Sequence, residues 1–154
     1  MDRMIAGFVS GLAATAPMTA AMVGMHRKLP GHHRYPLPPR RITMRVAEKL
    51  GVKHHLAEEH RTGLTMLAHF GYGAAVGTLF GLIAPRQPSR AIPAGVGYGL
   101  LVWAGSYLGL LPSMDLHRHA KHEPAERNGL MIAAHVVWGA AIGALAPAFR
   151  NPKE

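Results

Sequence analysis

Four long apolar segments constrain the fold of this chain more than any other feature. They cover residues 5–25, 64–84, 91–111 and 130–149, and none of them contains Lys, Arg, Asp or Glu. An α-helix needs about 20 apolar residues to cross the roughly 30 Å of hydrocarbon in a bilayer. Four such helices use most of a chain of 154 residues and leave little polar sequence to cover them in water. The sequence therefore predicts an all-α protein, a single membrane domain (residues 1–154) with four transmembrane helices.

The second and fourth segments are two copies of one sequence. Residues 61–79 align without a gap with residues 127–145, and Arg, Gly, Leu, Ala, His, an aromatic residue and Gly-Ala-Ala coincide. A weaker likeness joins residues 6–12 in the first segment to residues 94–100 in the third. This internal repeat predicts two tandem helical hairpins related by a pseudo-twofold axis along the membrane normal. The predicted units are residues 1–85 and 90–149.

Two polar connections join the predicted spans, and the first contains a helical pattern. Residues 40–50 place Ile42, Val46 and Leu50 on one face and basic residues elsewhere. Such a helix beside apolar spans is typical of a short interfacial amphipathic helix in the headgroup plane. An ordinary loop helix packed on the bundle fits the same pattern.

Most of the formal net charge of +9 lies in these connections. There it would contact anionic lipid headgroups, and no nucleic-acid-binding motif accompanies it. We therefore expect the lipid bilayer as a partner and no nucleic acid. The positive-inside rule favours cytoplasmic connections and outside termini.

One strongly polar side chain lies inside each copy of the repeat, His69 in the first and His135 in the second. On a helix, His69 shares a face with Gly73 and His135 with Gly139, and membrane helices pack closely along such glycine faces. We therefore expect both imidazoles inside the bundle, at matched depth and facing each other across the pseudo-axis. An ionisable side chain buried in a membrane is a candidate functional site.

The side chains expected around this pair suggest several ligands. They are Tyr72, Trp138, Met66 and Met131. Imidazole and thioether groups suit transition-metal ions such as Cu(I), and two imidazoles can be the axial ligands of a haem. Binding or transport of haem, a transition metal or protons is therefore the leading hypothesis. The alternative is a structural or accessory subunit in which the histidines only link helices, with the methionines as core filler.

The second connection is rich in potential metal ligands. His117, His119 and His122 lie between Asp115 and Glu123, and these side chains are the types that bind Zn²⁺, Ni²⁺ or Cu²⁺. Their spacing matches no established site, and a solvated His-rich loop explains them better. The chain has no cysteine, no nucleophile elbow, no phosphate-binding glycine loop and no His-Glu-x-x-His motif. Enzymatic activity is therefore not supported.

Several short motifs resemble the YagU-like inner-membrane proteins, a family whose function is largely uncharacterised. They are Leu37-Pro38-Pro39-Arg40, Ala68-His69-Phe70-Gly71-Tyr72-Gly73, Val102-Trp103, Leu111-Pro112, Glu123-Pro124 and His135-Val136-Val137-Trp138-Gly139. The resemblance implies a multi-pass protein of the inner membrane and no particular reaction. The many loop histidines depart from the family pattern. Because the glycine faces exceed what four helices need for each other, we also expect a homo-oligomer or a partner membrane subunit.

Overall fold

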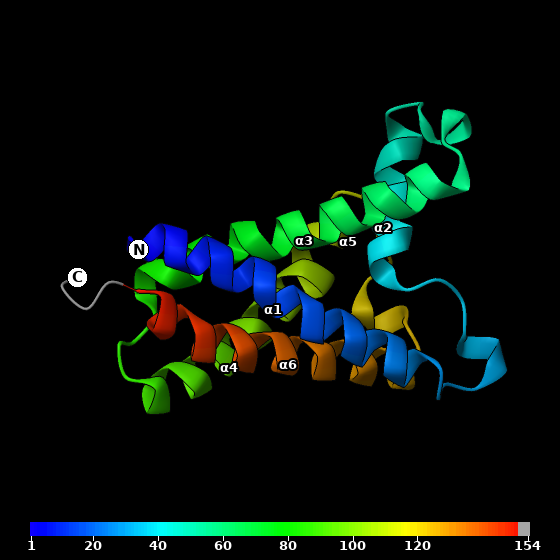
Figure 1. Ribbon diagram of the computed structural model, residues 1–154. Helices are drawn as coiled ribbons and strands as arrows, with labels where there is room; N and C mark the ends of the chain where they lie inside the picture. Colours follow the sequence, from blue (N-terminus) through cyan, green and yellow to red (C-terminus); the bar gives the residue numbers. More distant parts are fainter. Residues whose placement is uncertain (151–154) are drawn as a thin grey trace.

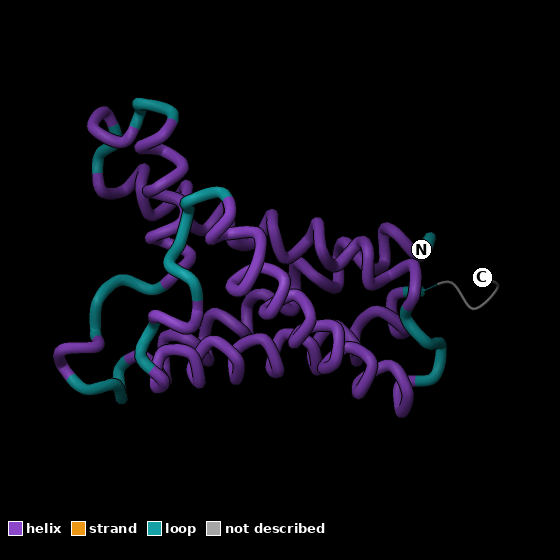
Figure 2. Tube along the Cα trace, turned by 180° about the vertical axis from the view of Figure 1, so that it is seen from behind, coloured by secondary structure: helices purple, strands orange, loops and turns teal. Residues whose placement is uncertain are grey.

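The computed structural model describes residues 1–150 and contains the four predicted spans (Figures 1 and 2). Three spans are continuous helices: α1 (Arg3–His26), α3 (Glu58–Ile83) and α6 (Ala125–Phe149). The third span has three successive parts, α4 (Pro88–Ala104), the π-helix η3 (Gly105–Leu110) and α5 (Leu111–Ser113). Residues 1–150 contain no strand, so the all-α prediction is confirmed, while the tail 151–154 lies outside the described residues.

Two spans begin earlier in the chain than their apolar segments do. Helix α3 begins at Glu58 and α6 at Ala125, where the predicted segments began at residues 64 and 130. The extra first turns are acidic, because they contain Glu58, Glu59 and Glu126. Carboxylates are favourable beside the positive end of a helix dipole. These turns therefore extend the helices beyond their apolar parts.

The helices pair as the repeat predicts. Helix α1 packs along α3 and α4 packs along α6, which gives two tandem hairpins with both termini at one end of the bundle (Figure 1). Glycine permits the close approach in each. A Cβ atom on Gly11 would collide with the carbonyl oxygen of Gly73, and one on Gly95 would collide with the carbonyl oxygen of Gly139. Both hairpins therefore use the same glycine faces.

Between the hairpins, the pseudo-symmetry is broken. Helix α1 also packs on α6, whereas α3 and α4 touch at few points. The indole of Trp138 is buried and donates a hydrogen bond to the Gly11 carbonyl at 3.3 Å. Tyr72 has the position of Trp138 in the first copy of the repeat, but its side chain is 45 % exposed and its hydroxyl bonds the Ser106 hydroxyl at 2.9 Å. Each interface between the two hairpins is called a seam. The seam between α1 and α6 is thus closed, and the equivalent seam between α3 and α4 is open.

The short helix α2 (Pro38–Lys49) lies across the end of the bundle that carries the long connections (Figure 1). It packs on α3, and its buried residues are Pro38, Thr43 and Ala47. Of the predicted apolar face, Ile42 is partly buried, whereas Val46 and Leu50 are exposed. The helix begins two residues before the predicted start, because Pro38 and Pro39 fit its first turn. Three short 3₁₀ segments complete the connections: η1 (Gly31–His33), η2 (Lys53–His55) and η4 (Ala120–His122).

Candidate functional site

A cavity of about 300 Å³ lies where the seam between the hairpins is open. Helices α3 and α6 and the π-helix η3 form its walls, and α2 covers it at the connection end. Its lining is mostly apolar, and the polar side chains that reach it are Thr15, Thr43, His69, Tyr72, Ser106, Tyr107 and His135. The size and composition are those of a small-molecule site at the lower end of the usual range.

His135 lies in the cavity wall with a fixed ring orientation. Its side chain is buried, and its Nδ1 bonds the carbonyl oxygen of Met131, one turn earlier in α6, at 2.7 Å. Because a carbonyl oxygen only accepts hydrogen bonds, Nδ1 carries the proton and Nε2 of the neutral ring carries a lone pair. The ring also packs edge-to-face against Tyr107, with centroids 6.0 Å apart. The site therefore presents Nε2 as an acceptor or a ligand atom.

His69 lies across the same cavity and has an unpaired ring nitrogen. The residue is half-buried, and its buried Nε2 has no hydrogen-bond partner. Leaving a buried polar atom unpaired costs about 1–3 kcal/mol. A bound molecule that pairs with the His69 nitrogen would recover this cost.

The two histidines lie in the same cavity, but they are not equally buried. Both line one cavity inside the bundle. They are unequally buried, because α1 covers α6 at the closed seam while nothing equivalent covers α3 at the open one.

The other predicted site residues divide into two groups. Tyr72, Gly73, Met131 and Trp138 line the cavity. Gly139 does not, because it faces the backbone of Gly95 in α4.

Met66 does not reach the cavity either; its side chain is 42 % exposed. In the repeat, the counterpart of Met131 is Thr65, which is buried, and Met66 corresponds to Ile132. A shift of one residue turns a helical side chain by about 100°. Met66 was expected around the histidine pair, but it lies outside the cavity that Met131 lines.

The loop histidines are not brought together as a metal site. His117 is buried beside Tyr107, and its Nδ1 bonds the Arg118 carbonyl at 2.8 Å. Burial lowers the pKa of His117. His119 accepts a hydrogen bond from the backbone of Lys121, and its ring lies 6.2 Å from that of His122. Across residues 1–150, no group of three or more His, Asp or Glu side chains is placed to hold a metal ion.

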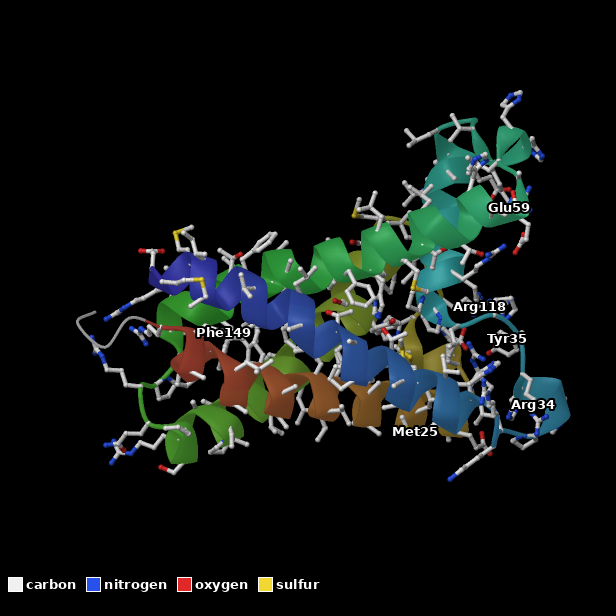
Figure 3. The ribbon with its side chains drawn as sticks, viewed as in Figure 1. Met25, Arg34, Tyr35, Glu59, Arg118 and Phe149 are labelled. Carbon is white, nitrogen blue, oxygen red and sulfur yellow. The ribbon has the colours of Figure 1, made fainter. Side chains whose placement is uncertain are left out.

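A buried ionic cluster beneath the connections was not predicted. Arg127 is 4 % exposed and donates hydrogen bonds to the carbonyl oxygens of His33, Tyr35 and Pro36 at 2.9–3.1 Å. Its guanidinium lies 3.6 Å from the centroid of the Tyr35 ring. In Figure 3, Tyr35 and Arg118 both lie at the end of the bundle with the long connections, and Phe149 lies at the other end. Arg127 thus holds the first connection onto α6.

Glu123 balances this charge. It accepts hydrogen bonds from the Tyr35 hydroxyl at 2.5 Å and from Arg41 at 3.0 Å. Burial raises the pKa of Glu123, but these hydrogen bonds outweigh burial and hold the pKa below its ordinary value.

The repeat did contain a signal for the cluster. Arg61 occupies the position of Arg127 in the first copy, and it also donates to connection carbonyls, those of Leu56 and Lys53 at 3.0 and 3.2 Å. Both repeat arginines therefore fasten segments of the first connection.

Together, the fold and the cavity define a multi-pass membrane protein with four spans in two hairpins and an apolar site between them. Residues 20–144 match the model of the family described as protein of unknown function (DUF1440), and the chain belongs to that family. Searches of curated proteins and of solved structures find no match to the chain.

Proposed function

We propose that this protein is a YagU-like protein of the inner membrane that binds a small, largely apolar molecule between its two hairpins. The observation that supports this is the pair of imidazoles, each with a ring nitrogen free to bind, in a cavity whose other walls are mainly apolar. Small-molecule sites commonly combine an apolar lining with a few convergent polar groups. The motifs shared with the YagU-like proteins support the inner-membrane location.

Each polar group has a distinct role in this proposal. The His135 Nε2 lone pair accepts a hydrogen bond from a hydroxyl or amide of the ligand, since Nδ1 is already bonded to Met131. His69 supplies a second ring nitrogen that has no partner in the protein. The apolar walls take up the remainder of the molecule.

One observation favours haem or a transition-metal ion as a second candidate ligand. Metal-binding histidines usually donate their other ring N–H to a carbonyl or carboxylate, as His135 does. A bare ion fits the residues poorly, because sites of this kind usually take three or four protein ligands and residues 1–150 offer no such group. Haem can be held by two histidines alone, so the number of donors here would be enough for it. His69 and His135 would hold it, and it would supply redox or gas-binding chemistry.

The accessory-subunit alternative receives less support. The hydrogen bond of His135 stays within α6, and His69 Nε2 has none, so neither ring forms a hydrogen bond between helices. Assembly with other helices remains a separate expectation. Gly97, Gly105 and Gly109 have open space around them, which is where a second copy or a partner subunit could pack.

The test is to identify what the purified protein carries. The protein in detergent is analysed by visible spectroscopy, metal analysis and mass spectrometry of an organic extract, and the double variant His69→Ala, His135→Ala is compared with it. The control is His119→Ala, His122→Ala, which removes two histidines outside the cavity. A stoichiometric organic molecule that is lost only from the cavity variant supports the proposal. A Soret band with the same dependence would assign haem instead. A protein with no ligand, whose cavity variant loses only stability, would overturn the binding function.

A further inference from the structure

The cavity reaches the surface of the protein at the side of the bundle, between α3 and η3. Four of its lining residues are also exposed, Ala68 and Tyr72 on one side and Leu110 and Met114 on the other. Three of them lie within the predicted membrane-crossing helices and Met114 follows directly. An opening at this place faces lipid.

Access from the connection end is covered by α2. Pro39, Ile42 and Thr43 of this helix line the cavity. The helix is fastened on two sides, to α3 by Arg40 and Glu58 at 2.6 Å and to the second connection by Arg45 and Asp115 at 2.5 Å. Lys49 also donates to the Met114 carbonyl at 2.7 Å, beside the opening. A molecule that enters the cavity therefore comes from the bilayer.

The interior suits hydrocarbon better than water. Apart from seven polar side chains, the lining of the cavity is apolar. Water beside such walls forms few hydrogen bonds with the protein, whereas an apolar chain needs none.

We propose that the cavity takes one acyl chain of a bilayer phospholipid, which enters sideways between α3 and η3. This inference rests on the proposed function of the cavity and concerns its apolar walls alone, because an acyl chain forms no hydrogen bond with His69 or His135. The chain lies against Met131, Trp138 and the apolar walls, while the phosphate headgroup stays at the level of the basic helix α2. The hydrogen bond between Tyr72 and Ser106 spans the opening as a latch.

The fluorescence of Trp138 can report whether an acyl chain occupies the cavity. Trp138 lines the cavity and is 2 % exposed, so surrounding lipid does not touch it. The variant Trp103→Phe leaves Trp138 as the only tryptophan. The protein is reconstituted into phosphatidylethanolamine–phosphatidylglycerol vesicles with acyl chains brominated near their middle, because bromine quenches indole fluorescence only at short range. We expect strong quenching of Trp138, although it is shielded from the surrounding lipid.

Two further variants and one control test whether the quenching depends on entry of an acyl chain between α3 and η3 or only on contact of the protein with surrounding lipid. Ala68→Phe narrows the opening and should reduce the quenching several-fold. Its matched control is Ala75→Phe, which places the same ring on an exposed position of α3 outside the cavity and should leave the quenching unchanged. Tyr72→Phe removes the latch with little change of volume and should increase the quenching. Equal quenching in all three variants would overturn entry between α3 and η3. If Ala68→Phe does not fold, the comparison of Tyr72→Phe with the unaltered side chain tests this entry alone.

The failure of this inference is distinguishable from failure of the proposed function. If Trp138 is not quenched while the extract contains a histidine-dependent polar compound, the acyl-chain assignment is wrong and the binding site stands. If a brominated free fatty acid quenches Trp138 and the brominated phospholipid does not, the phospholipid is overturned as the source of the chain.

Discussion

Replacement of one glycine at the interface between α1 and α3 tests the packing that organises both hairpins. A Cβ atom on Gly77 would lie 2.6 Å from the Gly11 Cα and 2.6 Å from the Gly7 carbonyl oxygen. Both are backbone atoms that cannot rotate away, so Gly77→Ala must push the helices apart. Overpacking of this kind costs about 1–3 kcal/mol. Alanine also favours a helix over glycine by about 1 kcal/mol, which partly hides the loss.

A matched control removes that complication. Gly71 lies in the same helix and has no atom within 4 Å of the position of an added Cβ. Gly71→Ala therefore gains the helix propensity without the collision, and the difference between the two variants isolates the overpacking cost of about 1–3 kcal/mol. That difference corresponds to a change of roughly 5- to 150-fold in the unfolding equilibrium.

Unfolding in mild detergent with increasing sodium dodecyl sulfate, followed by far-ultraviolet circular dichroism, measures this difference. The second hairpin provides an independent repetition. Gly143→Ala places a Cβ 2.7 Å from the Ile92 Cα, whereas Gly129 in the same helix has open space. The two hairpins should show similar penalties. Equal free energies of unfolding for Gly77→Ala and Gly71→Ala would refute the glycine packing of α1 on α3.

Two further predictions concern the cluster beneath the connections. Arg127→Met leaves three carbonyls without their donor and removes one of the cations beside Glu123, and it should lower the free energy of unfolding by about 3–5 kcal/mol. Arg61→Met, at the half-buried counterpart, should cost less, and equal losses in the same titration would contradict the difference in burial. Because the pKa of Glu123 is lower in the folded protein, its contribution to stability is fully present above its unfolded pKa of about 4.5 and is lost as the pH falls through the folded pKa. Glu123→Gln should remove this acid dependence, and an unchanged stability profile between about pH 6 and pH 3 would refute it.

The sequence was sufficient for the elements that depend on apolar length and on glycine spacing. Spans of about 20 apolar residues and the repeated glycines indicated four helices in two hairpins before any coordinates. The same pattern placed His69 and His135 inside the bundle, where both line the cavity. Helix ends were less accurate, because the acidic first turn at Glu58 lies outside the apolar signal.

The open seam could not be predicted, because the repeat itself implies two equal interfaces. Which interface closes depends on the fit of one side chain, Trp138, against the Gly11 backbone, and Tyr72 does not reproduce that fit at the other seam. The π-helix that brings Ser106 and Tyr107 to the cavity has no recognisable sequence pattern either. Met66 was misplaced for a simpler reason, since the spacing from methionine to histidine differs by one residue between the copies.

The two seams can differ because both hairpins belong to one polypeptide. Two separate copies of one hairpin, joined as a symmetric dimer, would have two identical interfaces, since a twofold axis makes every contact occur twice. Joining the hairpins covalently removes that obligation, and each seam is then free to change alone. In this chain α1 and α6 pack extensively. The seam between α3 and the third span has few contacts, among them the Tyr72–Ser106 and Tyr98–Val76 hydrogen bonds and the Phe80–Tyr98 ring contact. Duplication within one polypeptide thus allows one interface to hold the bundle together and the other to form a cavity.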